Sequence, residues 1–294
     1  MNKTRLIGIL SGLTATAIWG GMYVVSKVVL EVIPPFSLVT LRLVLGIFVL
    51  GFMVVRQGGT GFTRRQTLQA IGVGYVGYGI SLGFQFVGTR LSTASNSALV
   101  TSATPAFILL FAAWILHERI TWRRLAALVI STLGVLAVVD PSVARLSSDL
   151  FLGNLSLVAA ALTWALYSVL VRKVTRDLAL LPVTMVFFWG GLLVSLPAAG
   201  WELGHIPFGR INLWVVLGVL YLGIISTALA MYLWNKAFAT LEAGVASLTF
   251  FAQPVVGAGL GALFLKEELS LLFLAGGALI GIGLWLSARE ETGT

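Results

Sequence analysis

Aromatic and amide side chains recur at helical spacing in several apolar stretches of this chain. Trp19 and Tyr23 lie four residues apart, and Trp164 and Tyr167 three apart, so each pair shares one face of a helix. An indole or phenol ring offers a flat apolar wall with one hydrogen-bond donor. This chemistry predicts binding of an amphipathic solute rather than catalysis. The candidate binding residues are Trp19, Tyr23, Arg42, Tyr78, Gln85, Asn96, Trp164, Tyr167 and Gln253.

The third apolar stretch gives the longest run of such spacings. Gly74, Tyr78, Ser81 and Gln85 follow one another at intervals of four, three and four residues, which places them on a single face of an unbroken helix. Polar side chains inside a membrane helix usually face a cavity or another helix. Lining of a cavity and hydrogen bonding between packed helices both remain open for these residues.

Arg42 is the most informative single charge. It lies about six residues into an apolar stretch and is flanked by Leu41, Leu43 and Val44. A charged side chain at that depth is costly and usually functional. Its guanidinium could pair bidentately with the carboxylate of a solute, or its length could carry the charge outward to phosphate head groups. Both interpretations stay open.

The elements that position these residues follow from the composition. Of 294 residues, 58% are hydrophobic and 10% charged, whereas water-soluble domains carry about 25% charged residues. A helix needs about 20 apolar residues to cross the hydrocarbon layer. The sequence therefore predicts an all-α integral membrane protein embedded in a lipid bilayer. We expect ten transmembrane helices, at 6–30, 36–55, 68–88, 94–116, 123–139, 151–171, 182–199, 212–236, 243–265 and 270–287.

The distribution of charge indicates orientation rather than a nucleic-acid partner. The net charge is +8, but the basic residues gather in alternate loops. With the N-terminus in the cytoplasm, 13 of the 19 basic residues fall on the inside, which is the positive-inside bias. Both termini are then cytoplasmic, in a bacterial-type inner membrane. The apolar run after Lys3 and Arg5 continues to Leu30 without a small-residue exit, so we expect a retained helix rather than a cleaved signal peptide.

The second half of the chain resembles the first. The stretch from Leu10 through Trp19 to Lys27 is echoed from Leu155 through Trp164 to Arg172. Later markers recur in order as well. Pro105, Glu118, Thr121 and Gly134 correspond to Pro254, Glu267, Ser270 and Gly283. Two five-helix units, 1–145 and 146–294, would have opposite orientations because five is odd. Such inverted repeats are a common transporter architecture with the site between the halves.

The paired prolines and glutamates carry further expectations. Pro105 and Pro254 lie inside predicted spans, where proline kinks a helix and frees a carbonyl near Thr101 or Phe250. The kinks could be gating joints or static packing devices. Glu118 could form a gate-like ion pair with a basic neighbour such as Arg119, or it could be a plain interfacial charge.

These ordered motifs resemble the EamA domain of the drug/metabolite transporter superfamily. The likeness rests on the motif Pro105…Glu118-x-x-Thr121…Gly134 and on its copy in the second half of the chain. It rests also on Trp19-Gly20 and Trp164-Ala165 in the first helix of each half. It covers nearly the whole chain. It implies ten helices, cytoplasmic termini and export of metabolites such as amino acids. The aromatic-lined helices look most like the YddG-type exporters of aromatic and other amino acids.

Several functions lack the residues they need. No Asp or Glu falls within a predicted mid-span, so we expect facilitated diffusion or exchange rather than proton coupling. A membrane-embedded lipid-modifying enzyme would need clustered acids or histidines, and an exporter of hydrophobic cations would favour a carboxylate in the cavity; these stay as alternatives.

Gly72-x-Gly74-x-x-Gly77 has dinucleotide-loop spacing, but it lies inside an apolar span and predicts helix packing. We expect no cofactor and no metal. The sequence fixes neither the substrate nor the oligomeric state.

Overall fold

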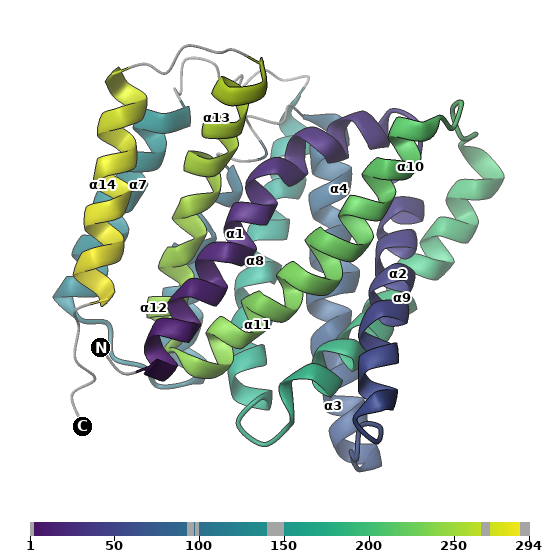
Figure 1. Ribbon diagram of the computed structural model, residues 1–294, viewed down its shortest axis with the longest axis horizontal. Helices are drawn as coiled ribbons and strands as arrows, with labels where there is room; N and C mark the ends of the chain where they lie inside the picture. The colour runs from purple at the N-terminus through teal and green to yellow at the C-terminus, as the bar shows by residue number, and fades with distance from the viewer. Residues whose placement is uncertain (1–2, 93–96, 98–99, 140–149, 266–270, 289–294) are drawn as a thin grey trace.

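The computed structural model describes residues 3–92, 97, 100–139, 150–265 and 271–288, and this part of the chain is helical without a strand (Figure 1). Helices of the first half are α1 (Lys3–Leu30), α2 (Pro35–Arg56), α3 (Arg64–Gly74), η1 (Tyr75–Ser81), α4 (Leu82–Leu91), α6 (Thr104–Ile115) and α7 (Trp122–Val139). Those of the second half are α8 (Phe151–Val174), α9 (Leu180–His205), α10 (Leu213–Leu220), η3 (Tyr221–Leu229), α11 (Ala230–Thr240), α12 (Ala243–Leu248), η4 (Thr249–Phe251), α13 (Ala252–Leu265) and α14 (Leu271–Ala288).

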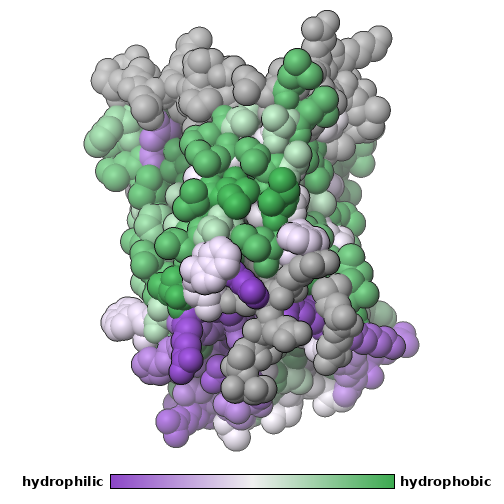
Figure 2. Space-filling view, turned by 90° about the vertical axis from the view of Figure 1, so that its left-hand side faces the viewer, coloured by the Kyte–Doolittle hydropathy of each residue, from purple (hydrophilic) through white to green (hydrophobic). Residues whose placement is uncertain are grey.

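Among the described residues, six continuous helices are long and apolar enough to cross a membrane. They are Lys3–Leu30, Pro35–Arg56, Arg64–Leu91, Phe151–Val174, Leu180–His205 and Leu213–Thr240, with shorter apolar helices at Thr104–Ile115, Ala243–Gly257 and Leu274–Leu286. The face that carries α7 and α14 is covered by hydrophobic side chains, and hydrophilic ones gather at one end (Figure 2). The all-α prediction is confirmed for the described residues, and their six long apolar helices have the length and composition of membrane spans.

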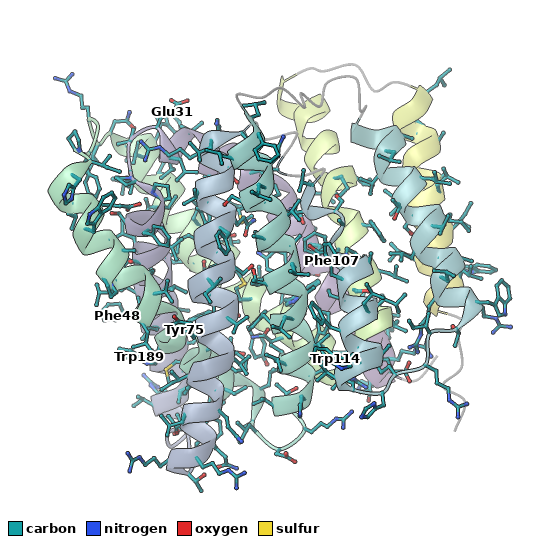
Figure 3. The ribbon with its side chains drawn as sticks, turned by 180° about the vertical axis from the view of Figure 1, so that it is seen from behind. Glu31, Phe48, Tyr75, Phe107, Trp114 and Trp189 are labelled. Atoms are coloured by element: carbon teal, nitrogen blue, oxygen red, sulfur yellow. The ribbon has the colours of Figure 1, made fainter. Side chains whose placement is uncertain are left out.

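The opposite flank is equally apolar. Phe48, Tyr75 and Trp189 lie on the side of the molecule formed by α2, the α3–η1–α4 helix and α9 (Figure 3), and all three are exposed. Trp201, Trp214 and Trp285, which lie near the ends of α9, α10 and α14, are exposed as well. Large aromatic side chains turned outward are stable in this chain because lipid, not water, surrounds them.

Helix boundaries differ from the predicted ones mainly at polar residues. The predicted span 182–199 continues as α9 to His205, past Pro197 and Glu202, and the predicted span 212–236 continues as α11 to Thr240, past Lys236. The predicted boundaries fall where an apolar run meets a charged residue. The helix itself continues until the backbone carbonyls of its last turn find other hydrogen-bond partners. The predicted span 94–116 lies partly outside the described residues, and so do Asn96, Lys266 and Glu267.

Two long helices each contain a π-helical segment. η1 begins at Tyr75 and η3 at Tyr221, so the two segments start 146 residues apart. The helices also pack in matching pairs. α1 packs against α11 and α13, α8 packs against α4 and α6, and α2–α9 and α7–α14 form pairs of their own. Figure 1 shows α7 and α14 side by side at one edge of the molecule.

Both prolines singled out from the sequence follow an interruption of their helix. Ser102 and Ala103 form a turn before α6, and Pro105 lies in the first turn of that helix. Pro254 follows the short 3₁₀ segment η4. The carbonyl of Thr101, four residues before Pro105, accepts a hydrogen bond of 2.6 Å from the Thr104 hydroxyl. A side chain therefore replaces the backbone donor that proline lacks.

Glycines allow α3 and α9 to meet backbone to backbone. A Cβ at Gly74 would collide with the Phe187 carbonyl, and a Cβ at Gly190 would collide with the Ile71 carbonyl. Gly77 likewise faces the Tyr167 ring. The interpretation of the glycine spacing as helix packing is confirmed for Gly74 and Gly77, whereas Gly72 has open space beside it.

Candidate functional site

A small central cavity lies between α1, the η1–α4 helix, α8, α11 and the η4–α13 region. Its volume of about 30 Å³ is room for one or two water molecules, so the cavity is too small to hold an amino acid in this conformation. It is lined by Trp19, Met22, Tyr23, Ser81, Leu82, Gln85, Thr101, Thr104, Ala160, Ala161, Trp164, Met231, Phe250 and Gln253. Within this lining no side chain carries a charge.

Aromatic rings form one wall of the cavity. The ring centroids of Trp19 and Trp164 are 5.7 Å apart at an interplanar angle of 80°, and the Trp19 ring lies 5.4 Å from that of Trp234. Phe250 completes the group at 6.4 Å from Trp19. Edge-to-face and tilted contacts of this kind add to the apolar burial. The Trp19 indole nitrogen donates to the Ser226 carbonyl at 3.0 Å, which holds that ring in place.

Hydroxyl and amide groups line the other side. The Gln85 amide donates to the Tyr23 hydroxyl at 3.2 Å. The Tyr23 and Thr101 hydroxyls lie 2.8 Å apart, and Thr101 donates its proton to the Ser97 carbonyl. Tyr23 must then be the donor to Thr101, because each hydroxyl has one proton. This chain of bonds orients Tyr23 across the cavity.

Two polar atoms of the lining lack a partner among the described residues. They are the indole nitrogen Nε1 of Trp164 and the amide oxygen Oε1 of Gln253. The two side chains are only 7% and 3% exposed. An unsatisfied buried donor or acceptor costs about 1–3 kcal/mol. The lining residues of the cavity therefore include one unpaired donor and one unpaired acceptor.

A second polar cluster lies behind the aromatic wall. Tyr167 donates to the Asn235 amide oxygen at 2.7 Å, the Asn235 amide nitrogen donates to the Tyr78 hydroxyl at 3.3 Å, and the two tyrosine hydroxyls bond to each other. Asn235 also donates to the Thr184 hydroxyl. All four side chains are fully buried. A closed ring of satisfied bonds fixes the positions of α8, α9 and α11 and leaves nothing free for a ligand.

Arg42 is buried at 0% exposure rather than extended to the membrane surface. Its Nε donates to the Leu222 carbonyl at 3.2 Å and to the Thr227 hydroxyl at 2.9 Å, both in η3. Its Nη2 reaches the Ser226 hydroxyl and the Met22 sulfur at 3.3 and 3.9 Å. The guanidinium also stacks over Phe86, with 4.8 Å between its carbon and the ring centroid. Met22 separates Arg42 from the cavity.

A cluster of charges joins the α6–α7 loop, α7, α8 and α12 at one end of the molecule. Glu118 accepts from Arg172 Nε at 2.9 Å and lies 3.6 Å from Arg124 Nη1. It also accepts from the backbone nitrogens of Ala243 and Gly244, at 2.9 and 3.2 Å. Arg124 pairs with Glu242, and Arg172 reaches the Leu241 carbonyl. Glu118 is therefore an ion-pair centre, and its partners are Arg172 and Arg124 rather than the nearby Arg119.

The structure thus separates the residues chosen from the sequence. Trp19, Tyr23, Gln85, Trp164 and Gln253 line the cavity, whereas Arg42, Tyr78 and Tyr167 lie behind its wall. Asn96 lies outside the described residues.

Sequence reasoning did not select Trp234 or Asn235, which shape the wall and the cluster behind it. They stood near the end of the predicted span 212–236. A buried Asn in a membrane helix is itself a signal of internal contacts.

Comparisons with known proteins agree on one family. The family model described as "EamA-like transporter family" matches residues 6–140 and again 151–289. A relative from Salmonella typhimurium named "Probable amino-acid metabolite efflux pump" is 28% identical over 94% of this chain and 92% of its own length. The Escherichia coli protein of the same name is 26% identical over 97% of this chain and 95% of its own.

Two further matches are a relative with a different printed name and a solved structure. A "Probable biotin transporter" from Pseudomonas aeruginosa is 31% identical over 73% of this chain and 75% of its own length. One solved crystal structure superposes with a TM-score of 0.78 at 22% identity, covering 95% of this chain and 96% of that one. At that identity the likeness shows the fold alone.

Proposed function

Because this chain belongs to the EamA-like transporter family, we propose that it exports small metabolites, chiefly aromatic and other neutral amino acids, by alternating access. The observation that carries this proposal is the central cavity with its aromatic wall, the unpaired donor of Trp164 and the unpaired acceptor of Gln253. An apolar side chain fits the wall, and a polar end group satisfies the two unpaired atoms. The names of two relatives as amino-acid metabolite efflux pumps support this substrate class.

An inverted repeat of two five-helix units, 1–145 and 146–294, supplies the proposed mechanism. Three observations support the duplication: the family model matches twice, η1 and η3 start 146 residues apart, and the partners of α1 correspond to those of α8. Two units that exchange conformations would open the cavity to each side in turn. The cavity lies between α1 and α8, the first helices of the two units.

We assign the end that carries the Glu118 cluster to the cytoplasm of a bacterial-type inner membrane. The positive-inside bias supports this orientation, since the basic residues Arg56, Arg64, Arg124 and Arg172 lie at this end of their helices. In this orientation the cluster joins the α6–α7 loop, α8 and α12 on the cytoplasmic side.

Replacing Trp164 by alanine is expected to lower amino-acid transport at least about tenfold without loss of membrane insertion. The change removes an aromatic wall residue and the free indole donor, and a lost side chain of this size is worth a few kcal/mol of binding. Uptake of a panel of amino acids into proteoliposomes measures the effect. Trp214→Ala, at an exposed Trp, is the matched control. Rates equal to the wild type across the panel would remove Trp164 from the site.

A pH gradient alone is expected to drive no accumulation of substrate. No acidic side chain lines the cavity, and proton-driven carriers commonly use an intramembrane acid or histidine. The measurement is uptake into proteoliposomes with a pH gradient but equal substrate on both sides. Uphill accumulation that collapses with a protonophore would contradict facilitated diffusion or exchange.

The amino-acid panel is also the experiment that tests the proposed function. Saturable uptake of aromatic amino acids, absent from protein-free vesicles, supports it. Uptake of hydrophobic cations with no uptake of amino acids would favour a multidrug exporter instead.

A further inference from the structure

Arg42 is a buried charge without a counter-ion in the part of the chain that the structure describes. Its hydrogen-bond partners are a backbone carbonyl, two hydroxyls and a thioether, all neutral. Its second terminal nitrogen, Nη1, has no hydrogen-bond partner among the described residues. Holding the η3 carbonyl of Leu222 requires a donor but not a net charge, so packing alone does not account for the guanidinium.

Arg42 is directly connected to the cavity wall. Met22 contacts the guanidinium on one side and lines the cavity on the other. Ser226 accepts from Arg42 through its hydroxyl and from Trp19 through its carbonyl. The charge is therefore one side chain away from the cavity, in surroundings of low dielectric where Coulomb forces are strong.

No charged side chain in the lining offsets this field. We propose that Arg42 makes the cavity selective for solutes that carry a carboxylate and excludes solutes with a net positive charge. This inference rests on the proposed transport function and names the substrate class of the same site. Arg42 acts on the solute through space, as a selectivity residue. A bound carboxylate supplies the missing counter-charge, whereas a cation adds a second positive charge to the same region.

Transport of a matched pair of solutes tests the proposal. The zwitterion phenylalanine and the permanent cation phenethyltrimethylammonium share one aromatic ring but differ in the carboxylate. We expect wild-type proteoliposomes to take up phenylalanine far faster than the cation. Arg42→Gln should reduce this ratio about tenfold or more, and Arg42→Lys, which retains the charge, should preserve it. Arg90→Gln, at an exposed arginine at the end of α4, is the matched control and should leave the ratio unchanged.

A purely structural role for Arg42 predicts a different result. Arg42→Gln would then slow both solutes equally and leave the ratio unchanged, which would overturn the inference. If no amino acid is transported by the wild type, the proposed function fails on its own.

Ligand-induced stabilisation tests the charge selectivity of the cavity without a transport assay, and the same comparison in Arg42→Gln assigns that selectivity to Arg42. Thermal unfolding of the purified wild type should shift upward with 3-phenylpropionate and not with phenethyltrimethylammonium. An equal or larger shift with the cation would overturn the inference.

Discussion

Alanine at Gly74 or Gly190 is expected to abolish accumulation of folded protein. A Cβ at Gly74 would meet the backbone of Phe187, and a Cβ at Gly190 would meet the backbone of Ile71, Gly74 and Tyr75. Backbone atoms cannot move aside as a flexible side chain does, so α3 and α9 must separate. Overpacking in a tight core usually costs 1–3 kcal/mol, and this contact falls at or above about 3 kcal/mol.

The same two helices supply the controls. Gly72 in α3 and Gly200 in α9 have no atom within 4 Å of an added Cβ, so Gly72→Ala and Gly200→Ala should express like the wild type. Size-exclusion chromatography in detergent and thermal unfolding distinguish the two classes. Wild-type behaviour of Gly74→Ala would show that the helices are further apart than described here.

Glu118→Gln is expected to open the end of the molecule at which the charge cluster lies. Glu118 binds Arg172, Arg124 and the backbone nitrogens of Ala243 and Gly244, so it joins the α6–α7 loop to α8 and α12. Removing one partner of a buried ion pair costs about 3–5 kcal/mol. We expect roughly half of that here, because solvent reaches the 18% exposed side chain of Arg172 and screens the pair.

Cysteine labelling measures this opening. The natural chain has no cysteine, so a single Ser247→Cys substitution in buried α12 reports access without background. Labelling by a water-soluble maleimide should rise about tenfold or more when Glu118→Gln is added, since 1.4 kcal/mol corresponds to tenfold. Glu31→Gln, an exposed acid at the opposite end (Figure 3), is the control. Equal labelling rates would show that the cluster does not hold this end closed.

Apolar runs predicted most helices because lipid imposes a simple rule on length and composition. The length and composition of apolar runs could not predict the ion-pair partners of Glu118. Its partner Arg172 lies 54 residues away, and the backbone nitrogens that it caps lie 125 and 126 residues away. For Arg42 the sequence could show that the charge was buried in an apolar stretch, but not that η3 would supply its partners. Contacts between distant segments decide such questions, and a single sequence does not display them.

The predicted common face of Gly74, Tyr78, Ser81 and Gln85 is present only in part, for a local reason: Ser81 and Gln85 line the cavity, whereas Gly74 and Tyr78 do not. On an unbroken α-helix these four residues share one stripe. In the structure Gly74 meets Phe187 of α9, whereas Ser81 donates to the Ala160 carbonyl of α8 and Gln85 reaches Tyr23. The π-helical segment η1 begins directly after Gly74. The predicted face depends on α-helical spacing of side chains along the whole stretch, and a π-helical segment breaks that spacing.

That segment changes the phase of the helix. Each residue of an α-helix advances the side-chain direction by about 100°, so one extra residue in a π-helical turn turns everything beyond it by a similar angle. At the α3 end, Gly74 packs against α9. At the other end, Ser81 donates to the Ala160 carbonyl of α8, and Leu82 and Gln85 of α4 line the cavity. Within one continuous helix, Arg64–Leu91, the side chains on the two sides of η1 therefore point in different directions around the helix axis. The same device at η3 lets α10 pack its Gly218 against Val29 of α1 while α11 brings Met231 to the cavity.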